Sequence, residues 1–100
     1  MGGAPDPDQT RANYAQRATR SGMSRIEWKC LDQLIRNESG WRANAASPTG
    51  RYGGLFQLRG LPPTTDLAEQ WERGLRYIRQ RYGTPCRALA FWNSHTPGWY

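Results

Sequence analysis

Glu38 is the side chain in this sequence that is best placed for acid chemistry. Three apolar residues precede it on the same face of a predicted helix: Leu31, Leu34 and Ile35. Ser39 and Gly40 follow it and predict the end of that helix. A carboxyl group among apolar neighbours has a raised pKa, because desolvation disfavours its ionised form. Glu38 could therefore donate a proton near neutral pH. The alternative is a glutamate at a frayed helix end, exposed to water or paired with Arg42.

A segment rich in glycine and aromatic residues, 52–58, could contact a ligand. Gly53 and Gly54 would let the backbone approach a ligand closely. The Gln57 amide can donate and accept hydrogen bonds, which suits sugar hydroxyl and N-acetyl groups. An ordinary surface hairpin is the alternative. His95 is the only histidine, and no Ser/His/Asp or Cys/His set occurs, so we predict neither a metal site nor a cofactor.

Three predicted helices must position these residues. The first begins at the capping box of Ser24 and Glu27 and ends at Ser39-Gly40. The second begins near Thr65-Asp66 and runs to Tyr82. The third begins at Thr84-Pro85 and ends at Asn93. Residues 42–63, between the first two helices, show no regular period, so we expect a long loop with a short strand or ribbon. Tyr77, beside the apolar stripe of the second helix, could face a cleft or lie at the edge of the core.

Residues 1–22 are predicted to be a linker or a mobile N-terminal segment, and residues 23–100 the folded domain. Residues 1–8 are rich in glycine, proline and aspartate and predict coil. Asp8 could cap a polar helix over residues 9–20, but Tyr14 is the only large apolar residue there. A helix that is polar all round packs poorly, so we expect this segment to be mobile.

Composition limits the classes of function. The net charge of +6 makes nucleic acid, a membrane surface or a bacterial cell wall available as anionic partners. The charge is scattered, which argues against nucleic acid. No apolar run is long enough to span a membrane, and the N-terminus does not resemble a signal peptide. Cys30 and Cys86 could form a disulfide or remain buried thiols. The five tryptophans and five tyrosines suit either stacking on sugar rings or a core.

Five short motifs, taken in chain order, resemble the soluble lytic transglycosylase domain of the lysozyme-like superfamily. They are Glu38-Ser39-Gly40-Trp41, Ser47-x-Thr49-Gly50, Gly54-Leu55-Phe56-Gln57, Gly74-x-x-Tyr77-Ile78 and Trp92-Asn93. Three further runs are similar to the small actinobacterial and phage type: Trp28-x-Cys30-Leu31, Tyr77-Ile78-x-x-Arg81-Tyr82-Gly83-x-Pro85-Cys86 and Gly98-Trp99-Tyr100. The resemblance covers residues 26–100 and implies a mainly α, lysozyme-like fold with a long substrate loop or short β-ribbon.

The resemblance also implies a role for individual residues. Glu38 matches the catalytic acid and base, and Ser39 the serine that helps set its local hydrogen bonding. Four positions match residues that orient the glutamate or contact substrate: Gln57, Tyr77, Trp92 and Asn93. Trp92 stands where the family often has tyrosine. Cys30 and Cys86 match a pair of cysteines that form a disulfide.

The activity implied is cleavage of the β-1,4 bond between N-acetylmuramic acid and N-acetylglucosamine in peptidoglycan. Residues 40–65 contain no Asp or Glu, which favours a route with one carboxylate and a 1,6-anhydro product over the usual two-carboxylate hydrolysis. A hydrolase of the same fold, helped by Asp66 or another distant carboxylate, is the nearest alternative. A non-catalytic module that binds cell wall or nucleic acid is another. We expect a monomeric domain that acts on the glycan strand, without nucleic-acid or membrane partners, outside the cell or in a phage virion.

Overall fold

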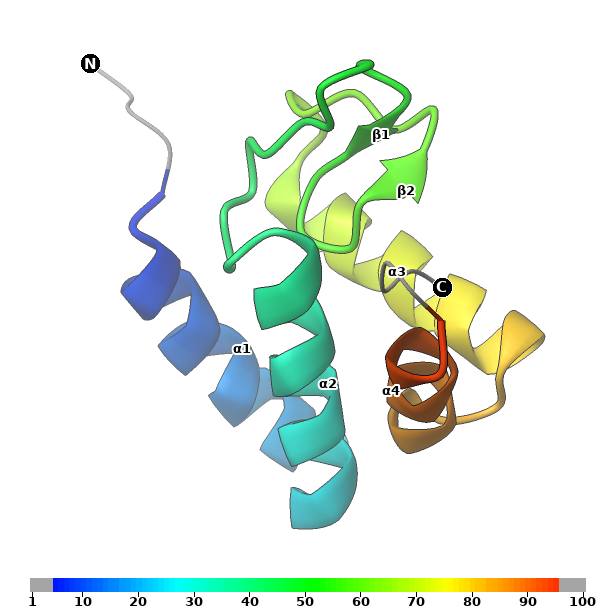
Figure 1. The fold of residues 1–100 in the computed structure, drawn as a ribbon. Coiled ribbons are helices and arrows are strands. Elements are labelled where there is room, and N and C mark those ends of the chain that lie inside the picture. Colours follow the sequence, from blue (N-terminus) through cyan, green and yellow to red (C-terminus); the bar gives the residue numbers. More distant parts are fainter. Residues whose placement is uncertain (1–4, 96–100) are drawn as a thin grey trace.

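The computed structural model describes residues 5–95. The Gly98-Trp99-Tyr100 run, one of the runs that carry the resemblance, lies outside the described residues. Its helices are α1 (Pro7–Arg20), α2 (Arg25–Glu38), α3 (Leu67–Arg81) and α4 (Pro85–Asn93). Its strands are β1 (Tyr52–Gly53) and β2 (Leu58–Arg59), which pair antiparallel (Figure 1). This arrangement confirms the predicted mainly α fold class, with a short β-ribbon inside the long loop.

The helix ends follow from local side chains. The Ser24 hydroxyl accepts a hydrogen bond from the Glu27 backbone N–H at 3.1 Å and begins α2. Thr84 accepts from the Arg87 backbone N–H in the same way at the start of α4. Asp66 stands at the N-cap of α3, but its side chain makes no capping hydrogen bond. The three predicted helices are otherwise confirmed.

The N-terminal segment differs from the expectation of a mobile linker, because α1 packs on the rest of the domain. Three of its residues are buried at a spacing of four: Thr10, Tyr14 and Ala18. This spacing makes one continuous stripe along a helix, although only Tyr14 is large and apolar. Arg11 on α1 also forms an ion pair with Asp32 on α2 at 2.8 Å. The helix is capped by Asp6, which accepts from the Asp8 backbone N–H, rather than by Asp8.

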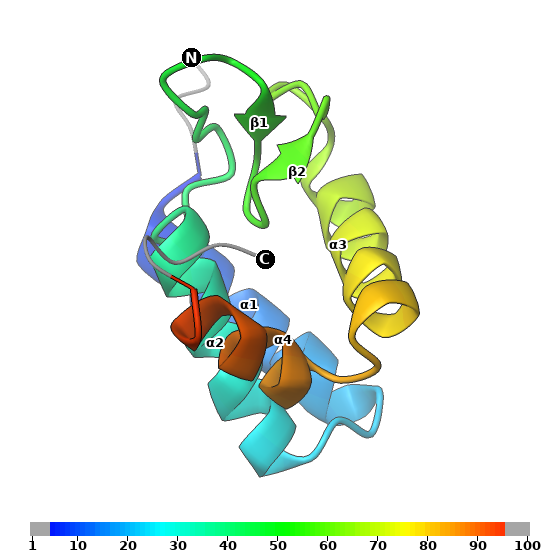
Figure 2. The ribbon, with the colours of Figure 1, turned by 45° about the vertical axis from the view of Figure 1, so that its right-hand side comes forward.

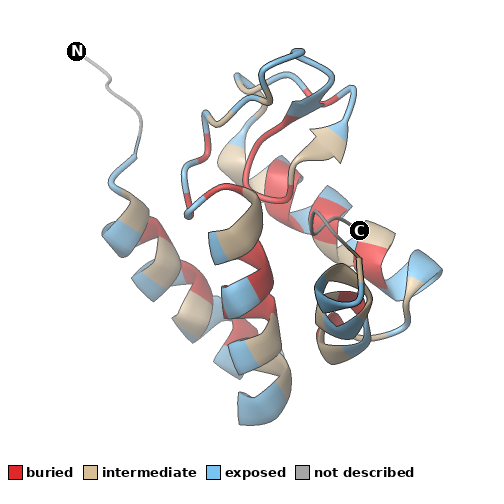
Figure 3. Ribbon diagram, viewed as in Figure 1, coloured by how far each residue is buried: buried red, intermediate tan, exposed pale blue. Residues whose placement is uncertain are grey.

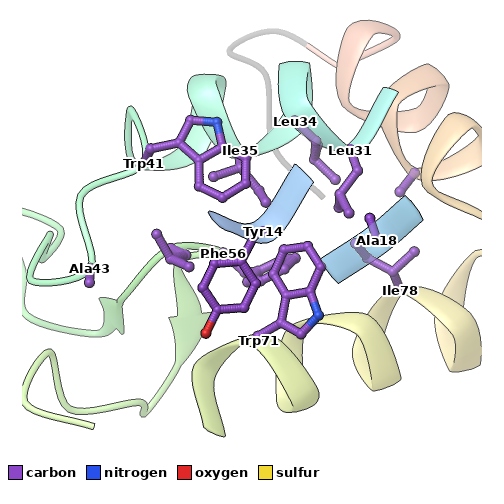
Figure 4. Packing of buried hydrophobic residues seen from close by; sticks show 12 residues of the cluster. Tyr14, Ala18, Leu31, Leu34, Ile35, Trp41, Ala43, Phe56, Trp71 and Ile78 are labelled. Carbon is purple, nitrogen blue, oxygen red and sulfur yellow. The ribbon is translucent and has the colours of Figure 1, made fainter. Parts of the chain in front are cut away.

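A group of aromatic side chains forms the centre of the core (Figure 4). Trp71 on α3 packs against Tyr14 of α1, with ring centroids 4.5 Å apart, and against Phe56 of the loop at 5.9 Å. Trp41, directly after α2, lies 6.5 Å from Trp71. Buried positions accordingly lie on the facing sides of α2 and α3 (Figure 3). The core therefore joins α1, α2 and α3 to the irregular loop, and Ala88 adds α4 to it.

The other helices and the ribbon are arranged around the end of α2. α2 and α4 pack side by side, α3 lies across from them, and the β1–β2 ribbon stands at one end of the domain (Figure 2). Within residues 5–95, no helix has the length and hydropathy that a membrane span requires. The last turn of α2, which carries Glu38, lies close to the loop that contains the ribbon (Figure 1).

A disulfide between Cys30 of α2 and Cys86 of α4 confirms the expected pairing. The two cysteines are 56 residues apart in the sequence, so the bond closes a long loop. The contact is reinforced by the Cys86 backbone N–H, which donates to the Glu27 carboxylate at 2.8 Å. Together these bonds fix the helix that carries Trp92 against the helix that carries Glu38.

Opening this disulfide should destabilise the domain strongly. A loop of this length corresponds to about 4 kcal/mol in the chain-entropy account, and measured losses are typically 2–5 kcal/mol. Urea unfolding with and without a reducing agent tests the expectation. The matched control is the Cys30→Ala/Cys86→Ala variant, whose stability should be low and unaffected by the reductant. An equal response of wild type and variant to the reductant would contradict the expectation.

Candidate active site

Glu38 is the last residue of α2, and its side chain is half-buried. Burial raises the pKa of the Glu38 carboxyl to about 7, and the Trp92 indole N–H acts in the opposite direction and lowers it. Desolvation is the larger effect, because the ionised carboxylate loses water on the buried side. Near neutral pH, Glu38 is therefore present both as an acid and as a carboxylate.

Glu38 faces a cavity of about 420 Å³, which we call the Glu38 cleft. The residues that line it are Glu38, Arg42, Ala45, Ala46, Ser47, Pro48, Tyr52 and Gln57. The Arg42 Nε atom donates to the Ser39 carbonyl oxygen at 2.9 Å. No ion pair joins Arg42 to Glu38 among the described residues, so the predicted alternative of a Glu38–Arg42 pair is not observed.

Gln57 lines the Glu38 cleft, and its amide is partly engaged. The Nε2 atom donates to the backbone carbonyl oxygens of Ala45 at 3.1 Å and Gly54 at 2.9 Å. These bonds leave the Gln57 Oε1 atom as the free acceptor. Gln57 also has a φ of 49°, in the left-handed region that few non-glycine residues adopt. The surrounding turn therefore fixes the side chain toward the cleft before any ligand arrives.

Ser39 and Asn93 line neither this cleft nor the cavity beside it. Ser39 is buried, with only 3% of its surface exposed, and its hydroxyl donates to the Leu55 carbonyl oxygen at 2.7 Å. It thus ties the end of α2 to the turn that carries Gln57, which is a positioning contact. Asn93 is exposed at the end of α4.

Tyr77 lies in a second, larger cavity of about 600 Å³, which we call the arginine groove. Its walls are Tyr52, Gln57, Leu58, Arg59, Gly60, Leu61, Arg73, Arg76, Tyr77, Gln80 and Arg81. Tyr52 and Gln57 line both cavities, so the arginine groove continues the Glu38 cleft. The pKa of Tyr77 is raised, first by burial and then by the neighbouring Tyr82, with a smaller contribution from the charge of Glu38. That contribution places Tyr77 within electrostatic reach of Glu38.

Trp92 is half-buried on α4, and its indole Nε1 atom is fully shielded from solvent. Among the described residues, no acceptor meets the distance and angle of a hydrogen bond to it. Its effect on the pKa of Glu38 nevertheless requires that the two groups lie near one another. Trp92 is therefore a donor close to Glu38, without a formed hydrogen bond. Its body packs against the core.

Gln70 is the main positioning residue that the sequence does not reveal. Its Oε1 atom accepts from the Leu55 backbone N–H at 2.9 Å. Its Nε2 atom donates to the carbonyl oxygens of Ala43 at 3.0 Å and Thr65 at 2.9 Å. The side chain is 1% exposed and lies on the stripe of α3 that also contains Gly74. A polar residue in a buried stripe was the available signal, but two of its partners, Ala43 and Leu55, are distant in sequence.

The first residue of the Gly-x-x-Tyr-Ile motif, Gly74, must be glycine for a steric reason. A Cβ atom at Gly74 would lie 2.2 Å from the Phe56 ring, which is far too close. Glycine at this point of α3 lets Phe56 pack directly on the helix backbone. The Phe56-Gln57 turn is consequently drawn against α3, and Gln57 is held between the two cavities.

The donor chemistry of the site does not suggest a metal. Within the described ranges, no group of three His, Cys, Asp or Glu side chains comes together. Glu38 is also the only Asp or Glu among the described residues that line the Glu38 cleft and the arginine groove. What the arrangement offers is one half-buried carboxyl group, flanked by amide, phenol and guanidinium groups.

The fold and the cleft define a mainly α, lysozyme-like domain in which Glu38 is the one carboxylate among the described residues that line the cleft. The chain is 38% identical over 77 residues to a membrane-bound lytic murein transglycosylase F of Marinobacter nauticus, a match that covers 71% of this chain. It is 32% identical over 80 residues, 80% of this chain, to the probable transglycosylase IsaA of Staphylococcus haemolyticus. A membrane-bound lytic murein transglycosylase F of Klebsiella pneumoniae is 35% identical over 60 residues, 54% of this chain.

These similarities support a lytic transglycosylase domain in this chain. The chain spans 14%, 31% and 12% of the lengths of these three relatives, respectively. No protein-family model matches the chain, and no solved structure shows a significant match.

Replacing Gln70 by leucine should loosen the loop that forms the cleft. The change removes three hydrogen bonds and leaves the Leu55 backbone N–H without its acceptor, which costs about 2–4 kcal/mol of unfolding free energy. Urea unfolding measures the loss, and hydrogen exchange of residues 43–58 should become faster. Gln16→Leu, at an exposed position of α1, is the matched control and should change stability little. Equal stability of the two variants would contradict the positioning role of Gln70.

Glu38→Gln should stabilise the protein at neutral and alkaline pH but not near pH 4. The folded-state pKa of Glu38, about 7, is above its ordinary value of 4.5. Burial therefore costs no stability below the ordinary pKa, where the group is protonated in both states, and the cost grows as pH rises through the folded pKa. We expect the variant to exceed wild type by about 1–2 kcal/mol near pH 8.5, a figure reduced for partial exposure, and to equal it near pH 4. Thermal unfolding at both pH values tests this, with exposed Glu72→Gln as control.

Proposed function

We propose that this domain is a peptidoglycan lytic transglycosylase that cleaves the β-1,4 bond between N-acetylmuramic acid and N-acetylglucosamine. The observation that carries the proposal is the isolation of Glu38, a half-buried carboxyl group with a pKa of about 7 in a cleft without a second carboxylate. The names of the similar proteins support the same reaction class. In this proposal the partner of the domain is the glycan strand, and its place of action is the cell wall.

Glu38 would act twice in this reaction. Its protonated form donates a proton to the oxygen that bridges the two sugars, and the bond from that oxygen to C1 of the muramic acid residue breaks. The acetamido group of the same sugar can stabilise the positive charge that develops at C1. The ionised Glu38 then accepts the proton of the C6 hydroxyl, whose oxygen bonds to C1 and closes a 1,6-anhydro ring. The proton count is restored, and no water is consumed.

A pKa near 7 suits both steps. Efficient proton transfer requires an acid that is partly protonated at the working pH and a base that is strong enough once ionised. The desolvation that raises the pKa of Glu38 provides the first property. The nearby Trp92 N–H favours the ionised state and supports the second. Tyr77 and the Gln57 Oε1 atom, on the walls of the same continuous cavity, are proposed to orient the sugar.

Hydrolysis on the same fold is the competing function, and the positions of the other carboxylates argue against it. Inverting hydrolysis requires a second carboxylate roughly 6.5–9.5 Å from the acid. Retaining hydrolysis requires a second carboxylate about 5–5.5 Å from the acid. Asp66 is exposed at the start of α3 and lines neither cavity. Asp32 is held by Arg11 and by the Trp41 indole N–H. Burial alone would raise the pKa of Asp32, but these hydrogen bonds bring it below its ordinary value.

The products distinguish the three functions. Wild-type protein incubated with purified peptidoglycan should release 1,6-anhydromuropeptides, detected by mass spectrometry, and Glu38→Gln should reduce them by at least a factor of 1,000, because no other acid lines the cleft. Glu72→Gln, an exposed glutamate on α3, is the control and should retain activity. Reducing-end products alone would establish hydrolysis. Binding without any product, unchanged by Glu38→Gln, would establish a wall-binding module.

A further inference from the structure

The arginine groove carries more positive charge than a neutral sugar chain requires. Four arginines contribute to its walls: Arg59, Arg73, Arg76 and Arg81. None of its described lining residues is acidic. Hydroxyl and acetamido groups are bound by amide and hydroxyl side chains such as Gln57 and Tyr77, and they gain little from several guanidinium groups. The charge of the groove therefore points to an anionic part of the ligand.

Two of the four guanidinium groups already have partners within the protein. Arg73 forms an ion pair with Glu69, one turn earlier on α3. The Arg81 Nε atom donates to the Tyr82 hydroxyl at 3.0 Å. Across residues 5–95, by contrast, the side chains of Arg59 and Arg76 form neither an ion pair nor a hydrogen bond. Both residues are exposed, so their charges are available to a ligand.

Arg59 and Arg76 belong to different elements that border the same groove. Arg59 lies on β2 and Arg76 on α3, and the views of the ribbon place these elements beside one another (Figures 1 and 2). Two like charges on one cavity repel each other, and an anion bound between them removes that repulsion. The planar guanidinium also matches a carboxylate with two parallel hydrogen bonds.

The groove continues the Glu38 cleft, so its anion should belong to the molecule that is cleaved. Tyr52 and Gln57 line both cavities. In a peptidoglycan strand the sugars are N-acetylated and uncharged, and the lactyl carboxyl is consumed in the amide bond to the peptide. The carboxylates of such a strand therefore lie on its peptide branches.

We propose that Arg59 and Arg76 bind carboxylates of the peptide branches, so that the domain prefers peptide-bearing glycan to bare glycan. This inference rests on the proposed function, because it assumes that a glycan strand occupies the Glu38 cleft. It assigns a substrate preference to Arg59, which lies outside the motifs that indicate the reaction, and to Arg76, which occupies an unspecified position of the Gly74-x-x-Tyr77-Ile78 motif. The two arginines are binding residues in this account and take no part in proton transfer.

Binding measured in the Glu38→Gln protein tests the inference, because the ligand then stays intact. Three ligands are compared by calorimetry: peptide-bearing strands freed of wall phosphate polymers, the same strands with the peptides removed at the lactyl amide and the freed lactyl carboxyls converted to neutral methylamides, and an uncharged N-acetylglucosamine hexamer. Adding Arg59→Gln/Arg76→Gln should weaken binding of the first ligand roughly 10-fold, as expected for two partly solvated charge pairs. Binding of the other two should change by less than about 2-fold. The loss should shrink at high salt.

Two matched variants distinguish the effect of the groove arginines on binding from effects of net charge and of protein stability. Arg20→Gln/Arg25→Gln removes the same charge at two exposed positions that line neither cavity, and it should bind all three ligands as the parent does. Arg59→Lys/Arg76→Lys keeps the charge without the planar fork and should recover part of the lost affinity. Thermal unfolding should be the same in all these variants, because the substituted side chains are exposed.

Several results would overturn the inference. One is that Arg59→Gln/Arg76→Gln weakens binding of all three ligands equally. Another is that Arg20→Gln/Arg25→Gln weakens binding of the peptide-bearing strands as much. A third is that affinity depends on Arg59 and Arg76 only in strands that retain wall phosphate polymers. Failure of the proposed function is a separate outcome. Wild-type protein that released no anhydro products, while Glu38→Gln binding kept its dependence on Arg59 and Arg76, would refute the reaction and leave peptide binding in place.

Discussion

The desolvation of one carboxyl group is the constraint on which the site depends. Glu38 is an ordinary glutamate at the end of a helix, and it becomes an acid of neutral pKa only if the loop of residues 42–63 covers one side of it. That loop contains little regular structure, so its backbone groups need side-chain partners. Ser39 and Gln70 supply them by bonding the Leu55 carbonyl oxygen and N–H, respectively. The chemistry of Glu38 thus rests on two buried polar side chains that never touch the cleft.

Packing in the core also holds the loop of residues 42–63 in place. Phe56 packs on the bare backbone of Gly74, and Trp71 joins that ring to Tyr14 on α1. Phe56, directly before Gln57, consequently attaches the loop to α3 through an aromatic contact, and β2 begins directly after Gln57. A small domain buries a limited fraction of its surface, which makes a covalent link valuable. The Cys30–Cys86 disulfide provides it between the helices that carry Glu38 and Trp92.

Local patterns predicted part of this structure and could not predict the rest. Helical spacing placed Glu38 on an apolar face, and Ser24 and Thr84 marked two helix starts, because these features depend on neighbours in sequence. The packing of α1 was missed because Thr10 and Ala18 are small, so their stripe is visible only when a partner surface exists. The role of Gln70 depends on Ala43, Leu55 and Thr65, which come together only in the folded chain. The same holds for the grouping of Arg59 with Arg76.

A single residue that must be first acid and then base needs opposing influences on its pKa. Desolvation raises the pKa of Glu38, and its place at the C-terminal end of α2 acts in the same direction, because the negative end of the helix dipole disfavours a carboxylate. Trp92 opposes both through its indole N–H. Stronger burial alone would make Glu38 an acid too weak to release its proton. A stronger influence of the Trp92 N–H would make the ionised carboxylate too stable to accept one. Because Trp92 lies on α4, the disulfide that fixes α4 to α2 also fixes this balance.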